Sequence, residues 1–249
     1  MNVVVCVKRV PDTETRIHVD ASGTGIDTVG VKYVLGPYDE YAVELALRTR
    51  EAAGDGEVGL LSFGDASAQE TLRKGLAMGA DRAVLLTGDV GMDGLATAKA
   101  LAAELEGGDA QLLLFGVKSV DDDQQQVGPM VATLLGRACV TGVTTFDVGD
   151  GTVVCRREVE GGVEVVEAAL PAVLTITKGP HEPRLASLKG IMAAKKKPLE
   201  ERPAQPFVSR LRLASLAEPP ARPPGRIVGE GTDAVPELVR LLREEAKAI

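Results

Sequence analysis

The sequence contains few of the residues on which nucleic-acid-binding proteins depend. It has no tryptophan, and aromatic residues make up 3% of the 249 residues. Aromatic side chains for base stacking are therefore scarce. The formal net charge of -8 also opposes binding to a phosphate backbone. We expect no nucleic-acid partner.

Cysteine and histidine are also scarce. Cys6, Cys139 and Cys155 are widely spaced, odd in number and outside any CxxC pair, which indicates neither a disulfide framework nor a thiolate metal site and fits a reducing cytoplasm. His18 and His181 are far apart. The chain has no HExxH, GxSxG or Walker-type GxxxxGK motif, and no Ser or Cys that pairs with a His. An α/β hydrolase is therefore disfavoured, and we predict no catalytic residues.

Long apolar runs are missing as well. The apolar start of the chain, residues 1–10, is too short to span a bilayer, and its charges follow the apolar residues instead of preceding them. We expect a buried strand there and a protein that is not embedded in a membrane.

Apolar residues nevertheless make up 45% of the chain, enough for a substantial core. Through about residue 135, short runs rich in Val and Leu alternate with helical patterns, which predicts a parallel sheet covered by helices in a three-layer α/β/α fold. The predicted strands are residues 3–7, 58–62, 83–86 and 111–115, and the predicted helices are residues 39–52, 66–82, 93–108 and 124–136.

The pattern changes after residue 140. Residues 153–176 alternate and turn at Gly161–Gly162, which predicts an antiparallel hairpin and a further strand that extend the same sheet. From Pro198 to Gly225 the chain is rich in proline and indicates an extended arm. Residues 232–249 recover helical spacing, with Asp233 or Thr232 as the N-cap. We therefore divide the chain into an α/β domain, residues 1–197, and an arm with a terminal helix, residues 198–249, which docks on a partner subunit.

Three consecutive acids, Asp121, Asp122 and Asp123, follow a predicted strand and precede a predicted helix. A metal site is disfavoured, because adjacent acids point in different directions and no calcium-loop spacing is present. Asp122 or Asp123 would instead cap the helix. The amides of residues 124–127 then become donors that could hold a phosphate at the helix end, or the stretch is simply a solvated helix start.

Several strings resemble the β subunit of electron transfer flavoproteins in order and spacing, over nearly the whole chain. They are "VKRVPD" (7–12), "GPYDEYAVELALR" (36–48), "QETLRKGLAMGADR" (69–82), "DDDQQQVGPM" (121–130), "REVEGGVEVVEAALPAVLT" (157–175) and "EPRLASLKGIMAAKKK" (182–197). The resemblance implies an electron carrier of fatty acid β-oxidation and not an enzyme. It would form a heterodimer with an α subunit that holds most of a redox-active FAD. Electrons would pass from acyl-CoA and related dehydrogenases to a membrane quinone oxidoreductase.

The resemblance also implies an adenine nucleotide in this chain, AMP or, in bifurcating members, a second FAD. Carried over by motif, the binding residues are Cys6, Gly36, Pro37, Tyr38, Asp39, Phe63, Gly116, Val117, Lys118, Ser119, Val120, Asp121, Asp122, Asp123, Gln124, Gln125, Gln126 and Val127. These segments are strand ends or helix starts of one parallel sheet, where such folds place their crevice. Many AMP-binding relatives have Asn at position 125 and Thr at position 127, so Gln125 and Val127 leave AMP favoured over FAD but open. Thr13 aligns with an aromatic residue near the flavin in some relatives.

Residues 182–192 match the family's recognition loop, with Leu188 as the leucine that enters a pocket of the dehydrogenase. Without the resemblance, Leu188 would be expected in the core. Lys195, Lys196 and Lys197 follow and could steer an acidic partner, pack on the α subunit or be solvated. Arg157 and Glu158 match a pair near the FAD domain in relatives, with a simple surface charge pair as the alternative. For the whole chain, the alternative is a stand-alone adenine-nucleotide-binding regulatory protein.

Overall fold

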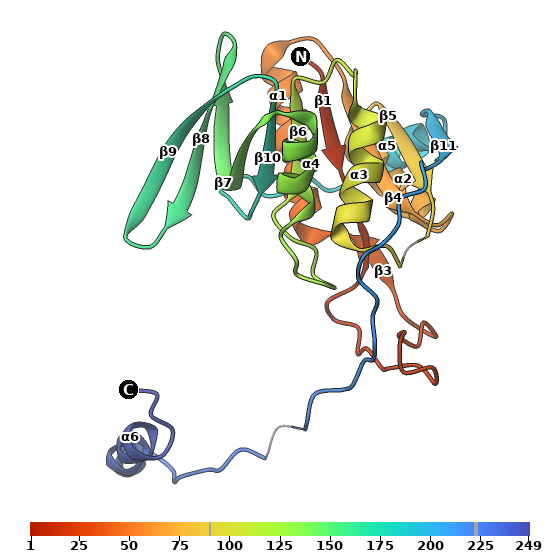
Figure 1. The fold of residues 1–249 in the computed structure, drawn as a ribbon. Helices are drawn as coiled ribbons and strands as arrows, with labels where there is room; N and C mark the ends of the chain where they lie inside the picture. The colour runs from red at the N-terminus through yellow and green to blue at the C-terminus, as the bar shows by residue number, and fades with distance from the viewer. Residues whose placement is uncertain (90, 222–223) are drawn as a thin grey trace. The chain divides into compact units, whose positions relative to one another are not determined.

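The computed structural model describes residues 1–89, 91–221 and 224–249, so Arg222 and Pro223 of the expected arm lie outside the described residues. The described chain divides into two compact units, Met1–Ser215 and Leu216–Ile249. The first unit contains the predicted α/β domain, built on one large sheet (Figure 1).

The sheet has nine strands. They are β1 (Val3–Cys6), β4 (Val58–Gly64), β5 (Arg82–Thr87), β6 (Leu112–Gly116), β7 (Ala138–Val148), β8 (Thr152–Val159), β9 (Gly162–Ala169), β10 (Ala172–Ile176) and β11 (Leu199–Pro203). Their order is β11-β5-β4-β1-β6-β10-β7-β8-β9. Neighbours are parallel from β11 to β7, whereas β8 and β9 are added antiparallel. The fold class and the hairpin extension predicted from the sequence are confirmed.

Helices cover both faces of the parallel strands. The helices of this unit are α1 (Pro37–Ala53), α2 (Ala68–Met78), α3 (Gly94–Leu105), α4 (Val127–Leu135) and α5 (Leu188–Ala194). Helices α1 and α2 share one apolar core with one face of the strands, and α3 and α4 share a second core with the other face (Figure 1). Side chains alternate between the two cores, as in Leu113 and Leu114 of β6. Both faces of each central strand are buried, which explains the continuous apolar runs.

Strand β1 lies at the point where the chain changes direction across the sheet. The chain adds β4 and then β5 on one side of β1, and after α3 it places β6 on the other side. Parallel sheets open a crevice beyond the carboxyl ends of the strands at such a point. The topology therefore sets Cys6, Phe63 and Gly116, each at or near the carboxyl end of its strand, at one edge of the sheet.

Some local details differ from the sequence prediction. Val159 pairs with Gly162, so the hairpin turns at Glu160–Gly161, one residue before the predicted turn, and Gly161 takes the positive φ of 85° that such a turn favours. A small antiparallel pair, β2 (Arg9–Pro11) and β3 (Tyr33–Leu35), was not predicted, because three-residue strands carry no periodic signal. Beyond the expected boundary at residue 197, β11 pairs with β5 and so belongs with the first unit.

The second unit contains a short 3-10 turn, η1 (Thr232–Ala234), and helix α6 (Val235–Glu244). The expected N-cap, Asp233 or Thr232, is wrong: both residues lie within the 3-10 turn, and Ala234 takes the cap position. Apolar side chains of α6 are exposed, among them Leu238 at 43% and Val239 at 38%. Among the described residues, no helix is both long and apolar enough to cross a membrane.

Candidate functional site

A cavity of about 580 Å³ lies at the carboxyl edge of the parallel strands. It receives Cys6 from β1, Phe63 from β4 and Gly116 from β6. Of the predicted nucleotide residues, those that line it are Cys6, Asp39, Phe63, Gly116, Val117, Lys118, Ser119, Asp121, Asp122, Gln124, Gln125, Gln126 and Val127. Its volume is within the range of small-molecule sites. The cavity therefore brings together segments that are more than 100 residues apart, such as Cys6 and Gly116.

The remaining predicted nucleotide residues lie outside the cavity lining. Gly36 lies against the Asp39 carboxylate, and Tyr38 lies against Gly116. Asp123 turns its side chain to Lys118, and its Oδ1 lies 2.8 Å from the Lys118 Nζ. The others, Pro37 in the first turn of α1 and Val120 in the loop after β6, do not line the cavity.

Asp39 joins the ends of the two central strands. Its Oδ2 accepts a hydrogen bond from the Lys8 N–H at 2.8 Å, and its Oδ1 accepts one from the Gly116 N–H at 3.0 Å. A Cβ at Gly36 or at Gly116 would collide with this carboxylate, so glycine is required at both positions. The side chain is 7% exposed, and burial raises its pKa to about 7, although both N–H donors act to lower it.

The acids that follow β6 are paired with lysines. The Lys8 Nζ lies 2.8 Å from Asp121 Oδ2 and 3.1 Å from Asp122 Oδ2. Burial acts to lower the pKa of Lys8, but hydrogen bonds and charges of these two acids raise it overall. Together with the Asp123–Lys118 pair, this contact offsets the negative charge of the acidic run. A phosphate could then approach the neighbouring amides without strong repulsion.

The expected N-cap role of Asp122 or Asp123 is wrong. Helix α4 begins at Val127 with Gln126 as its N-cap residue, and no side chain caps it. The acids instead bind lysines, and the chain reaches the helix through two residues with positive φ, Asp123 at 57° and Gln125 at 56°. Where left-handed residues alternate with right-handed ones, successive N–H groups can turn toward one side and bind an anion. This backbone, and not the carboxylates, is suited to a phosphate.

Glycines let helices approach the cavity closely. A Cβ at Gly128 would lie 2.8 Å from Thr175 Cγ2, and one at Gly94 would lie 2.7 Å from Gln124 Oε1. The first turns of α4 and α3 therefore lie close to the sheet and to the loop after β6. Because the first N–H groups of a helix lack intrahelical partners, both helix ends offer donors near this cavity.

Sequence reasoning missed part of the lining. Arg9 and Tyr33 come from the small β2/β3 pair, with the Arg9 guanidinium 3.5 Å from the ring centroid, and Met92, Gly94 and Thr97 come from the start of α3. The α3 residues could have been found, because their segment follows β5 at the same edge of the sheet. The Arg9–Tyr33 contact had no sequence signal.

Asp93 caps α3 beside the cavity and also holds the arm. Its Oδ1 accepts from the Ala96 N–H at 2.8 Å, and its Oδ2 accepts from the Arg210 and Leu211 N–H groups at 2.6 and 3.0 Å. These backbone hydrogen bonds lower the pKa of Asp93 to about 2, and the hydrogen bond from Ala96 has the largest effect. The arm is therefore fixed to the rim of the cavity as far as Leu211.

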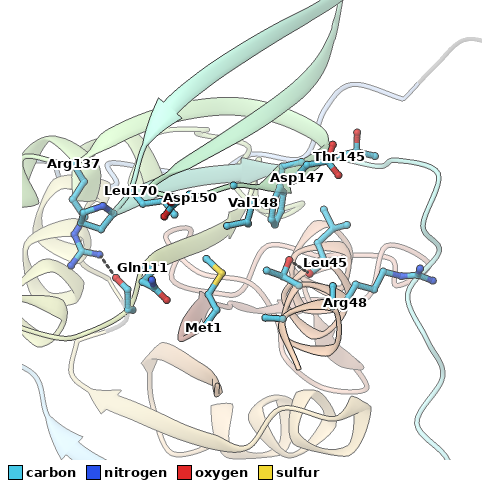
Figure 2. Close-up of a pocket in the computed structure, with 18 of the residues that line it drawn as sticks. Met1, Leu45, Arg48, Gln111, Arg137, Thr145, Asp147, Val148, Asp150 and Leu170 are labelled. Atoms are coloured by element: carbon cyan, nitrogen blue, oxygen red, sulfur yellow. Dashed lines mark hydrogen bonds between the residues drawn. The ribbon is translucent and has the colours of Figure 1, made fainter. Parts of the chain in front are cut away.

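A second hollow, of about 1020 Å³, lies at the opposite edge of the sheet (Figure 2). Met1, Leu45, Arg48 and Arg137 point into it or line it, and the Arg137 Nη1 donates to the Ala110 carbonyl at 3.1 Å. None of the predicted site residues lines this hollow. Among the described residues, no group of three or more His, Cys, Asp or Glu is arranged to hold a metal ion.

The segment after β10 exposes several apolar side chains. Leu188 is 76% exposed and Leu185 is 95% exposed, so the interpretation of Leu188 as a core residue, which the residues alone favoured, is excluded. Ser187 caps the short helix α5 by accepting a hydrogen bond from the Gly190 N–H at 3.0 Å. Apolar side chains this exposed are typical of a contact surface when they gather in one segment.

The three lysines after α5 have different environments. Lys195 and Lys196 are exposed, whereas the Lys197 Nζ donates to the carbonyls of Leu76 and Ala80 at the end of α2. A cation at this position stabilises a helix C-terminus. Lys197 is thus structural, and only the other two are available to a partner.

The hairpin residues lie on the exposed β8/β9 surface. Arg157 pairs with Glu164 at 2.6 Å, and Glu158, exposed on the same strand, lies opposite Val163. Arg157 therefore forms a surface charge pair, as the alternative interpretation expected, but with Glu164 and not with Glu158. Thr13 is exposed in the loop that follows β2.

Comparison with known proteins identifies the family. Residues 24–206 match the electron transfer flavoprotein domain. The chain is 39% identical over 250 residues to the electron transfer flavoprotein subunit beta of Bradyrhizobium diazoefficiens, with 99% of both chains covered. The chain belongs to the electron transfer flavoprotein beta-subunit family. The subunits of Bacillus subtilis, 35% identical, and of Arabidopsis thaliana mitochondria, 36% identical, are covered over 100% of both chains.

Membership of this family assigns the chain to electron transport as a flavoprotein subunit. It also agrees with the motif resemblance, whose strings are spread over nearly the whole sequence. Because the relatives are covered end to end, the arm and the terminal helix lie within the alignments to these relatives, whereas the domain match ends at residue 206.

The pKa of Asp39 leads to a test of the strand junction. Asp39 ionises near pH 3.8 when unfolded but near pH 7 when folded, so the folded state binds more protons between these values. The stability that Asp39 contributes is therefore complete below about pH 4 and is lost as the pH rises toward 7. Relative to Asp39→Asn, the free energy of unfolding of the wild type should fall by about 1.4 kcal/mol per pH unit over this window.

Urea unfolding of both proteins at several pH values between 4.5 and 7.5 measures this difference. Taking the difference between the two proteins removes the titration of the other acids, which they share. A difference that stays flat across the range would mean that Asp39 is ionised in the folded chain throughout.

Proposed function

We propose that this chain is the β subunit of a heterodimeric electron transfer flavoprotein that carries electrons and turns over no substrate of its own. The pathway we infer runs from acyl-CoA and related dehydrogenases, through FAD held mainly by the α subunit, to a membrane quinone oxidoreductase. The observation that carries the proposal is the cavity at the carboxyl edge of the sheet, with its lysine-paired acids and its loop of positive φ, in a chain of this family.

In this proposal the cavity holds the phosphate of AMP on the N–H groups of residues 124–127. Support comes from the positive φ of Asp123 and Gln125, which directs N–H groups toward one side, and from the neighbouring lysines. The β1 and β4 strand ends would enclose the adenosine, where Cys6 and Phe63 lie. AMP would have a structural role, because this cavity offers it no reactive group.

The described residues that line the cavity include no activated nucleophile. Burial, and then the charge of Asp39, raise the pKa of the Cys6 thiol, which keeps it protonated. FAD, when bound by the pair of subunits, supplies the redox chemistry. This chain would contribute a surface near it, in particular at Glu158, whereas Thr13 provides no aromatic side chain for a flavin contact.

A second FAD in the cavity is the alternative, as in a bifurcating β subunit. Gln125 and Val127 favour it, since a Val at the helix start provides no hydroxyl for a phosphate. This alternative changes the nucleotide but not the location of the site.

Docking surfaces for two partners complete the proposal. Leu188, with Lys195 and Lys196 nearby, would contact the dehydrogenase, as an apolar anchor with a basic rim. Residues 198–249 would dock on the α subunit. The exposed apolar side chains of α6 support this role, because an amphipathic helix needs an apolar surface to cover it.

We also infer a cytoplasmic location, supported by three free cysteines.

Co-expression with an α subunit of the same family tests the core of the proposal. We expect a yellow heterodimer that contains FAD, and a nucleotide released on denaturation whose mass identifies AMP. FAD in excess of one molecule per heterodimer, without AMP, would support the bifurcating alternative. A colourless chain that stays monomeric beside the α subunit would contradict the proposal and favour a stand-alone nucleotide-binding protein.

Removal of the second unit tests the docking of the arm. Truncation after Ser215 keeps β11 in the sheet and removes α6. We expect the α/β unit to remain folded by circular dichroism and association with the α subunit to weaken strongly on gel filtration. If the truncated chain associated with the α subunit over the same range of protein concentrations as the full chain, the second unit would have no part in the interface.

Substitution of the exposed leucine tests docking on the dehydrogenase. Leu188→Ala should raise the KM of the dehydrogenase for the heterodimer roughly tenfold, because truncation of an interface anchor costs more than about 1 kcal/mol. Heterodimer formation should not change, since the side chain is 76% exposed. Leu134→Ala is the matched control, because Leu134 is also exposed but lies on α4, in the opposite helix layer. Equal KM values for wild type and Leu188→Ala would contradict the assignment.

A further inference from the structure

Arg184 fastens residues 182–192, here called the docking segment, to helix α1. Its Nε and its backbone N–H donate to Glu44 Oε2 at 2.7 and 3.1 Å, and its Nη2 donates to Glu44 Oε1 at 3.1 Å. Its Nη1 also donates to Glu51 Oε1 at 2.6 Å, and its Nη2 to Glu51 Oε2 at 3.1 Å. One guanidinium therefore binds two carboxylates that are seven residues apart on the same helix.

Glu44 is unusual among the acids of this chain because its side chain is 2% exposed. Burial acts to raise its pKa, but the hydrogen bonds from Arg184 and then Arg48 outweigh this effect and lower the pKa. A buried carboxylate needs such partners to remain ionised. Substitution of the Arg184 side chain would leave Glu44 with Arg48, at 2.7 Å, as its one charged partner among these contacts, beside the backbone N–H of residue 184.

Polar contacts hold the docking segment on both sides of its exposed leucines. Before them, the Tyr41 hydroxyl of α1 donates to Glu182 Oε2 at 2.8 Å. After them, the Arg73 Nη1 of α2 donates to the carbonyls of Ala194 and Lys197 at 2.6 and 2.7 Å. Between these points, Leu185 and Leu188 remain largely exposed. The segment is thus ordered by polar groups, which leaves its apolar side chains free for a partner.

We propose that Arg184 is a positioning residue that presets the docking segment for the electron donor by clamping it to Glu44 and Glu51. The inference rests on the proposed function, because it requires that Leu188 contacts a dehydrogenase. A segment already held in its bound conformation loses less conformational entropy on binding. The guanidinium fork is needed for the clamp, since an ammonium group cannot bind two carboxylates in this planar geometry.

The experiment uses the complete heterodimer with a bacterial acyl-CoA dehydrogenase as the electron donor. Arg184→Gln should raise the KM for the heterodimer roughly five- to tenfold with kcat little changed, because preorganisation and not chemistry is lost. Arg184→Lys should recover only part of the affinity. Reduction by dithionite, which requires no docking, should proceed at the wild-type rate in both variants.

Arg50→Gln is the matched control. Arg50 of α1 also joins two elements, because its Nη1 donates to Asp81 Oδ2 at 2.6 Å, but it lies outside the docking segment. We expect the KM of the dehydrogenase for the Arg50→Gln heterodimer to equal that for the wild type. The double variant Glu44→Gln with Arg184→Gln leaves no unpaired buried charge at position 44. It should fold where the single variant is unstable, and it should still show the raised KM.

Amide hydrogen exchange of the purified heterodimer supplies a readout that needs no dehydrogenase. Residues 182–192 should exchange at least tenfold faster in Arg184→Gln than in wild type, while the exchange of α3 is unchanged. Suppose that Leu188→Ala raises the KM. The inference would then be overturned if Arg184→Gln left either the KM or the amide exchange of residues 182–192 unchanged. An unchanged KM in Leu188→Ala would overturn the docking surface itself, and the exchange data would then show separately whether Arg184 orders the segment.

Discussion

The carboxylate of Asp39 is the contact on which the centre of this structure depends. It accepts one hydrogen bond from Lys8, two residues after the end of β1, and another from the last residue of β6, so that the start of α1 is tied to both central strands. Gly36 and Gly116 provide the space that this side chain occupies. The loop after β6 begins at this contact, and the same loop carries the paired acids and the residues with positive φ. The geometry of the candidate nucleotide site therefore depends on one buried acid among the residues that line the cavity.

Much of the fold could be predicted from the sequence because the central strands are covered on both faces. Strands such as β4 and β6 must be apolar at nearly every position, and the helices between them must be amphipathic, so both leave strong local patterns. Elements with weaker patterns were missed. The three residues of β2 are too few to show alternation, and the charged sequence of β11, Leu199–Pro203, gives no sign that it completes a parallel edge. Its position is decided by its pairing with β5, which is a tertiary contact.

The candidate site likewise has features that the local sequence pattern predicts and features that only tertiary contacts decide. Its location could be predicted, because strand ends of a parallel sheet meet at one edge. The role of the acidic run could not, since Lys8 is more than 110 residues from Asp121 in the sequence but 2.8 Å from it in space. The helix cap was predicted wrongly for a related reason: the lysines bind the carboxylates, and the backbone reaches α4 through the left-handed residues Asp123 and Gln125. Outside glycine, residue type gives only a weak signal for this conformation. The exposure of Leu188 is likewise decided by contacts of its neighbours, such as that of Arg184 with Glu44.

Strand β11 also bears on how the protein is made. The sheet edge at β5 is covered by a strand that lies more than 110 residues later in the chain. During synthesis the ribosome therefore releases β5 long before the strand that protects its outer edge. An unpaired parallel edge can pair with other chains, and larger proteins are most prone to aggregate while such edges are open. The growing chain thus passes through a period in which the apolar strand β5 has one open edge, and this period ends only after residue 203 has emerged.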